Sequence, residues 1–219
     1  MDGGSMKSRE EPVLVGVVVY EGVEPIDIGG TVGVMSMAQR ILPALRYTVI
    51  AEAKGPVKLA SGLVMMADSD FQSAPSCDVY VVTGGPGWRD QVKNTAMLDF
   101  LKSRQTSALA SVCTGALILS ASGQLDGKTA TTRRRAVGAE TDAPVDLLAT
   151  FGRISSAREA AIVDDHGVVT SGGVSLAIDG MLYVLGKLYG EAARDEVARV
   201  IEYDRAFAAN RGALKHVKA

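Results

Sequence analysis

The sequence is poor in the residues on which most cysteine hydrolases and metalloproteins depend. Its 219 residues include 2 histidines, 2 cysteines and 1 tryptophan, and aromatic residues make up 5% of the chain. The 2 cysteines, Cys77 and Cys113, are too few for a disulfide framework. We therefore expect a reducing, cytoplasmic location, and we predict neither a cofactor nor a metal ion.

The net charge is small, and long apolar runs are missing as well. The formal net charge is -2, which gives no electrostatic footprint for nucleic acid or for an anionic membrane surface. No apolar run approaches the length of a transmembrane helix, and the N-terminus lacks the apolar core of a signal peptide. We expect a protein that acts on a small molecule, without nucleic-acid or membrane partners.

The chain has enough apolar residues for one substantial domain. Hydrophobic residues make up 47% of it, and no linker, repeat or low-complexity segment divides it. We predict a disordered leader over residues 1–12, a single domain over 13–208 and a basic tail over 209–219. Residue 13 opens a β-branched run typical of a strand buried on both faces.

Apolar periodicity makes strands and helices alternate through this domain. The pattern predicts an α/β three-layer sandwich with a mostly parallel sheet. We expect strands over 13–20, 47–53, 79–83, 107–112 and 129–132, hairpins over 57–66 and 160–171, and helices over 32–41, 94–104, 116–121, 145–150, 176–188 and 191–207.

Cys113 stands between a predicted buried strand and a predicted buried helix. Gly115 closes the turn, so the pattern is that of a nucleophile elbow, which would hold the thiol at the amino end of the helix. There the helix dipole and the free N–H groups would favour the thiolate. The alternative is that Cys113 is a small buried hydrophobe, as many free cysteines are.

Two further features follow strand ends and would lie at the same edge of the sheet. Asp27 is either a helix cap or a carboxyl group placed against the thiol to transfer a proton. The run that begins with Gly84 and Gly85 lacks the spacing and the lysine of a phosphate loop. It is either a plain turn or half of an oxyanion hole, formed by the Gly85 and Thr114 amides.

A histidine partner for the thiol is not evident. We predict surface positions for both histidines, His166 in a hairpin turn and His216 in the tail. A thiol without an imidazole argues against amide hydrolysis, because a leaving amine needs an acid to protonate it.

The other polar and aromatic residues of interest are not assigned a catalytic role. We expect a solvated face for Arg133-Arg134-Arg135, although one member could point inward and lower the pKa of the thiol. Cys77 has no recognisable partner, and Asp179 is expected to be structural. Trp88, just past the glycine turn, would either line the pocket or cover it.

Five segments together resemble the DJ-1/PfpI (ThiJ) superfamily, in particular its isocyanide hydratases and the amidase-like sensor domains of AraC-type regulators. The resemblance implies a flavodoxin-like fold, a homodimer and Cys113 as nucleophile. It further implies Asp27 as the neighbouring acid, with Thr114 and Gly85 beside the nucleophile. The segments are Pro25-Ile26-Asp27-Ile28-Gly29-Gly30, Thr83-Gly84-Gly85-Pro86-Gly87, Ser111-Val112-Cys113-Thr114-Gly115, Asp126-Gly127-Lys128-Thr129-Ala130-Thr131-Thr132 and Thr170-Ser171-Gly172-Gly173-Val174-Ser175-Leu176-Ala177-Ile178-Asp179.

The chain departs from this pattern at one place that bears on substrate range. Relatives of this branch carry Thr-Thr-His-Trp where this chain has Thr131-Thr132-Arg133-Arg134. The resemblance implies hydration of an isocyanide to an N-substituted formamide through a thioimidate on Cys113. There are three alternatives. The protein could be a redox or stress protein that works through oxidation of Cys113, a sensor domain without turnover, or a glyoxalase- or amidase-type enzyme.

Overall fold

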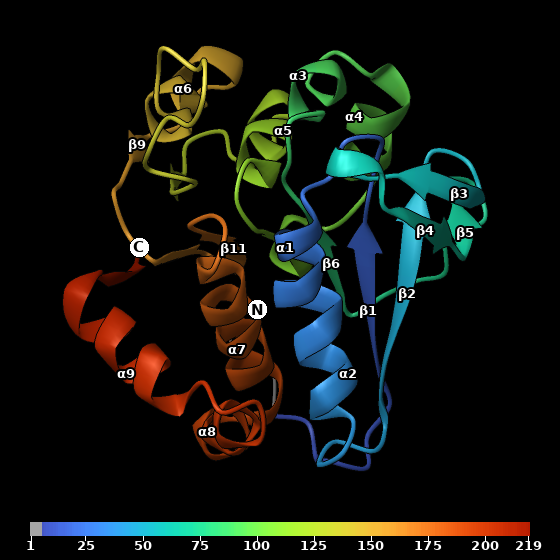
Figure 1. Cartoon of the computed structure of the whole chain (residues 1–219), viewed down its shortest axis with the longest axis vertical. Coiled ribbons are helices and arrows are strands. Elements are labelled where there is room, and N and C mark those ends of the chain that lie inside the picture. Colours follow the sequence, from blue (N-terminus) through green and yellow to red (C-terminus); the bar gives the residue numbers. More distant parts are fainter. Residues whose placement is uncertain (1–5) are drawn as a thin grey trace.

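A computed structural model describes residues 6–219. One sheet of eight strands forms its centre (Figure 1), in the order β12-β10-β11-β7-β6-β1-β2-β5. Neighbouring strands are parallel except for the β10–β11 hairpin. The strands are β1 Val13–Val18, β2 Leu45–Ala51, β5 Ser69–Asp70, β6 Val79–Val82, β7 Leu109–Ser111, β10 Ile162–Asp165, β11 Val168–Ser171 and β12 His216–Lys218.

Helices cover both faces of this sheet, and the predicted three-layer α/β fold is confirmed. On one face, α2 (Val34–Ala38), α7 (Leu176–Tyr189) and α8 (Glu191–Val200) pack against one another. On the other face, α5 (Gly115–Ala121) packs with α3 (Trp88–Gln91), α4 (Thr95–Lys102) and α6 (Pro144–Phe151). The central strands β1 and β6 are almost wholly buried, as expected for β-branched runs between two helical layers.

Two small sheets lie outside the central one. The predicted hairpin over 57–66 is the antiparallel pair β3 (Gly55–Lys58) and β4 (Val64–Ala67). A second pair joins β8 (Thr129–Ala130) to β9 (Ser156–Ala157). The predicted strand 129–132 is therefore shorter than expected. Among the described residues, no helix has the length and apolar character needed to cross a membrane.

The first helix begins earlier than the sequence suggests. α1 (Pro25–Ile28) continues through a π-helical turn, Gly29–Gly33, into α2. Asp27 therefore lies in the first turn of a helix, whereas we expected it in a loop ahead of a helix over 32–41. Pro25 fixes a helical φ at the first position, where its missing N–H costs nothing.

Both ends of the predicted domain differ from expectation. Residues 1–5 of the predicted leader lie outside the described residues, but Lys7 is attached to the domain. Its N–H donates to the carbonyl oxygen of Leu188 at 2.8 Å, and Arg9 forms an ion pair with Glu196 of α8. The prediction of a disordered leader is therefore wrong for the segment from Lys7 onward.

The predicted tail 209–219 is also part of the fold. The last predicted helix ends at Val200, and α9 (Asp204–Ala213) then buries Phe207. β12 pairs in parallel with β10 at the edge of the sheet. An edge strand gains its stability from backbone hydrogen bonds, which the basic composition of this segment did not reveal.

The packing of the first helix on α7 gives a test of the fold. A methyl group at Gly30 would lie 2.5 Å from Cβ of Ala177, whereas one at Gly33 would meet no heavy atom within 4 Å. We expect Gly30→Ala to lower the free energy of unfolding by about 1–3 kcal/mol through overpacking. The matched control Gly33→Ala should leave it unchanged or raise it by up to about 1 kcal/mol. Urea denaturation of both variants measures the difference, and equal midpoints would contradict this packing.

Candidate active site at the carboxyl edge of the sheet

Cys113 lies in the turn between β7 and α5. Its backbone has φ = 51°, a conformation that non-glycine residues seldom adopt, and 4% of the residue is exposed. The turn is fixed on both sides: the Cys113 N–H donates to the carbonyl oxygen of Gly172 at 3.3 Å, and the Thr132 hydroxyl donates to the Cys113 carbonyl oxygen. These two hydrogen bonds hold the turn in place despite its strained backbone.

The carboxyl group of Asp27 lies against this thiol. Asp27 is fully buried, Oδ2 accepts the Gly84 N–H at 2.9 Å, and the carboxyl group lies close enough to the thiol for each group to affect the pKa of the other. Oδ1 has no hydrogen-bond partner among the described residues. A methyl group at Gly84 would lie 2.7 Å from Cβ of Cys113 and 2.8 Å from Oδ2 of Asp27. Only glycine at this position lets the acid and the thiol approach each other.

Burial has the largest effect on the pKa of both groups. It raises the pKa of Asp27 from 3.8 to about 7, against the lowering effect of the Gly84 hydrogen bond, and the Glu24 carboxylate raises it further. Burial, followed by the charge of Asp27, raises the pKa of Cys113 to about 12. The expected thiolate is therefore wrong for the resting protein. The nearby Thr114 and Val174 N–H groups lower the pKa of the thiol, but desolvation outweighs them.

The predicted oxyanion pair is not a pair of free donors. The Gly85 N–H donates to Oγ1 of Thr114 at 2.9 Å, so one of the two amides already has an acceptor. The Thr114 N–H lies near the sulfur and lowers the pKa of the thiol. Gly85 and Thr114 nevertheless line the cavity beside the sulfur.

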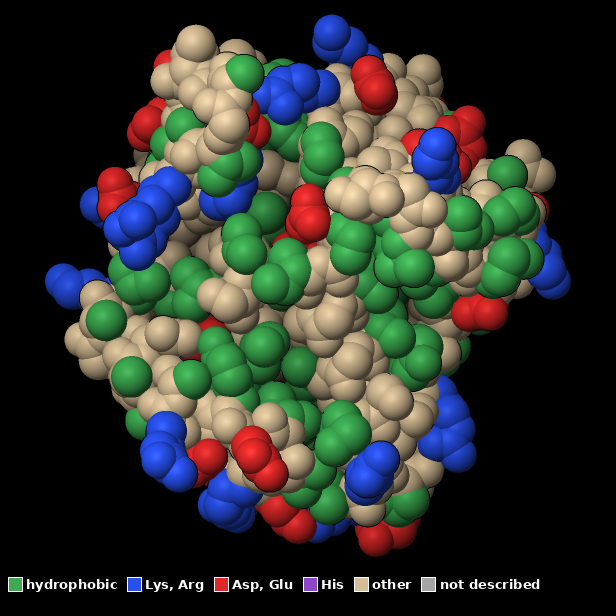
Figure 2. All heavy atoms as spheres, viewed as in Figure 1, with side chains coloured by type: hydrophobic (Ala, Val, Ile, Leu, Met, Phe, Trp, Pro, Cys, Tyr) green, Lys and Arg blue, Asp and Glu red, His purple; other side chains and the backbone are tan. Residues whose placement is uncertain are grey.

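A cavity of about 230 Å³ opens onto the sulfur. Its wall is mainly apolar, and Ile26 and Val174 at its margin are 45% and 40% exposed. Ile26 belongs to α1, and Val174 lies in the loop just before α7. Hydrophobic side chains gather over α1, α2 and α7 on the face of the molecule that Figure 2 shows. Trp88 lines this cavity, as one of the two predicted alternatives had it. The lining residues are Glu24, Ile26, Gly85, Pro86, Trp88, Cys113, Thr114, Arg133, Val137, Glu140 and Val174.

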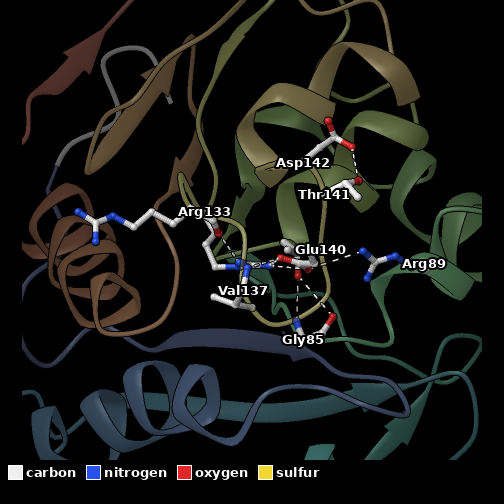
Figure 3. Close-up of polar contacts among 9 residues, drawn as sticks. Gly85, Arg89, Arg133, Val137, Glu140, Thr141 and Asp142 are labelled. Atoms are coloured by element: carbon white, nitrogen blue, oxygen red, sulfur yellow. Dashed lines mark hydrogen bonds and ion pairs between the residues drawn. The ribbon is translucent and has the colours of Figure 1, made fainter.

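One member of the arginine run points inward. Only 11% of the Arg133 side chain is exposed, and its Nη2 donates to both carboxylate oxygens of Glu140 at 2.8 and 2.7 Å (Figure 3). Glu140 also accepts the Val137 N–H at 2.9 Å and lies 3.7 Å from the Arg89 guanidinium. The sequence suggested an inward arginine, but it gave no sign of Glu140, whose loop has no periodic pattern.

Neither histidine lines this cavity. His166 lies in the β10–β11 turn with 72% of its side chain exposed, as predicted, and its Nδ1 lies 2.6 Å from Oδ1 of Asp165. The prediction of a surface position is wrong for His216. This residue is half-buried in β12, burial lowers its pKa to about 4, and its Nε2 has no hydrogen-bond partner among the described residues.

Asp179 and Cys77, the remaining residues that the sequence singled out, make contacts within the fold. Asp179 of α7 accepts hydrogen bonds from Tyr203 at 2.9 Å and from Asn210 at 3.1 Å, so it ties α7 to the C-terminal helix. Cys77 is buried and its sulfur lies 3.5 Å from the carbonyl oxygen of Pro75. Over residues 6–219, no group of three or more histidine, cysteine and acidic side chains is arranged to hold a metal ion.

The raised pKa of Asp27 makes stability depend on pH. Between about pH 4 and about pH 7 the folded chain keeps a proton that the unfolded chain has released, so the free energy of unfolding falls as pH rises. Across this pH range the free energy of unfolding falls by a total on the order of 4 kcal/mol. We expect Asp27→Asn to remove this slope, as measured by urea denaturation at intervals across that range. Parallel curves for the two proteins would mean that the Asp27 carboxyl group has an ordinary pKa.

Comparison with known proteins places this geometry in a family. Residues 13–186 match the DJ-1/PfpI family. The chain is 31% identical over 191 residues to an isonitrile hydratase of Pseudomonas putida, a match that covers 86% of this chain and 78% of the relative. A ThiJ/PfpI family protein from Pseudomonas syringae has a TM-score of 0.74 at 26% identity, with 89% of this chain and 76% of the other covered.

The same fold occurs in Drosophila melanogaster DJ-1beta. That structure has a TM-score of 0.73 at 20% identity and covers 88% of this chain and 98% of its own. The family model matches residues 13–186, which is most of the sequence. This chain is therefore a member of the DJ-1/PfpI family.

Proposed function

We propose that the protein adds water to the terminal carbon of an isocyanide and releases an N-substituted formamide. The observation that carries the proposal is the buried pair of Asp27 and Cys113, a carboxyl group beside a thiol that lines a cavity without a histidine. The 31% identity to an isonitrile hydratase supports the same reaction. Hydration of an isocyanide expels no amine, so it needs no imidazolium acid.

In the first step, Cys113 attacks the isocyanide carbon. Asp27 with a pKa of about 7 is substantially ionised at neutral pH, while the thiol with a pKa of about 12 keeps its proton. The carboxylate takes the thiol proton as the S–C bond forms, and then donates it to the same carbon. The product is a thioimidate, and Asp27 is again a carboxylate. The Thr114 and Val174 amides stabilise the sulfur while it carries negative charge.

In the second step, water cleaves the thioimidate. Water adds to the imidate carbon. Asp27 takes one proton from this water and passes it to the nitrogen. The remaining hydroxyl proton passes to the sulfur as the C=O bond forms and the C–S bond breaks. The formamide leaves, and Cys113 is once more a thiol. One water is consumed per isocyanide, and no oxidant, reductant or metal takes part in these steps.

The buried thiol favours this reaction over a redox role. Oxidation to a sulfinate proceeds through the thiolate, and burial holds the pKa of Cys113 at about 12. In the proposed hydration no free thiolate is needed, because Asp27 removes the thiol proton as the S–C bond forms. A homodimer and a cytoplasmic location, which the sequence led us to expect, stay predictions.

Two substitutions test the roles of the pair. Cys113→Ala should abolish conversion of para-nitrophenyl isocyanide to its formamide, because no thioimidate can form. Asp27→Asn should lower kcat by about 10²–10⁴-fold, the usual contribution of a positioned acid–base group. Chromatographic measurement of the formamide gives the rates, and Cys77→Ala is the matched control for loss of a buried thiol. Turnover that survives Cys113→Ala would refute the proposed reaction.

The pH dependence of the reaction provides a second test. Because the reactive form pairs ionised Asp27 with a protonated thiol, kcat/KM should rise with pH and level off above a pKa of about 7. The descending limb should lie beyond the ordinary assay range, since the Cys113 pKa is about 12. Asp27→Asn should remove the inflection from its residual activity. A wild-type profile that falls as pH rises through 7 would instead assign the active form to protonated Asp27.

A further inference from the structure

Arg133 separates the cavity at the sulfur from a second cavity. The second cavity has a volume of about 350 Å³ and shares three lining residues with the first, Arg133, Val137 and Val174. Gly173, which lines the second cavity, also touches the sulfur. A methyl group at Gly173 would lie 2.7 Å from Sγ of Cys113 and 2.8 Å from Cβ of Arg133. A ligand that reaches the sulfur can therefore extend past Arg133 into this adjoining cavity.

The adjoining cavity is positively charged. Its wall includes Arg133, Arg134 and Arg135, and none of its lining residues is acidic. Over residues 6–219, Arg134 and Arg135 form no ion pair. The first cavity differs, because Glu24 and Glu140 line it and Asp27 lies behind the sulfur. An anionic group would thus be repelled near the sulfur and attracted on the far side of Arg133.

The chain itself demonstrates that Arg133 can bind a carboxylate. Its guanidinium holds Glu140 through two hydrogen bonds, with the Val137 N–H as a third donor (Figure 3). Both bonds come from Nη2, and they are charge-assisted, as arginine–carboxylate hydrogen bonds are. The second and third arginines of the run offer the same chemistry without an internal carboxylate to satisfy it.

We propose that the substrate is an isocyanide with an anionic substituent, of which a carboxylate is the simplest. The isocyanide carbon lies at Cys113, the body of the molecule crosses the apolar wall formed by Val137 and Val174, and the anion binds in the adjoining cavity. Arg134 and Arg135 are then the residues that determine specificity. This inference rests on the proposed hydratase function, and it names the substrate class of the same site.

A matched pair of substrates tests the charge directly. We expect kcat/KM for 4-isocyanobenzoate to exceed that for its uncharged methyl ester by about tenfold or more, the effect of one charge-assisted hydrogen bond. The preference should shrink as ionic strength rises, because salt screens exposed charges. Equal kcat/KM values for the acid and the ester would overturn the anionic substrate class while leaving hydration intact.

Paired variants locate the anion. Arg134→Gln/Arg135→Gln should lower the acid-to-ester ratio of kcat/KM by about tenfold, since it removes the unpaired arginines. The control Arg40→Gln/Arg199→Gln makes the same change in net charge at two exposed positions that line neither cavity. The control should leave the ratio unchanged. A ratio that falls equally in both double variants, or in neither, would refute the assigned cavity.

Binding without turnover separates this inference from the reaction. Trp88 is the single tryptophan of the chain and lines the cavity at the sulfur, so its fluorescence reports occupancy. We expect 4-formamidobenzoate to bind more tightly than its methyl ester, and the Arg134→Gln/Arg135→Gln variant to lose that preference. If neither isocyanide is hydrated, the proposed function fails, and this titration still decides the anion site. Equal affinity of the acid and the ester would overturn it.

Discussion

The site depends on one contact, that between the buried carboxyl group of Asp27 and the thiol of Cys113. The two residues are far apart in the sequence, and three separate elements bring them together. Pro25 starts the helix that carries the acid, the turn after β7 presents the sulfur, and Gly84 leaves room between them. Because both groups are removed from water, the pKa of each is raised, and the charge of Asp27 raises that of Cys113 further, so the thiol keeps its proton when Asp27 is ionised.

Burial explains why this pair is suited to proton transfer and poorly suited to permanent charge. The amino end of a helix lowers the pKa of a thiol, and two backbone N–H groups add to that effect at Cys113. Desolvation is nevertheless larger here, so the resting group is a thiol. A carboxyl group with a pKa of about 7 is then a matched partner, since it can both accept and return a proton near neutral pH.

Arg133 shapes the surroundings of this pair. Arg133 is nearly buried and lowers the pKa of both Asp27 and Cys113, so it acts on the thiol as well as on a ligand. Its ion pair with Glu140 closes one side of the cavity with a polar contact. Members of one fold family can therefore share a cysteine turn and differ in the charged residues around a bound ligand.

The amino-acid sequence alone determined the alternation of strands and helices, the turn at Cys113 and the resemblance that named Asp27, Thr114 and Gly85, because local periodicity and short motifs encode these features. It could not determine what depends on contacts across the chain. These are the strand at His216–Lys218, the burial that makes Cys113 a thiol, the internal acceptor of the Gly85 amide, and the carboxylate that Arg133 holds. Only the tertiary structure fixes which groups lose water and which donors find a partner, and those two outcomes set the chemistry of the site.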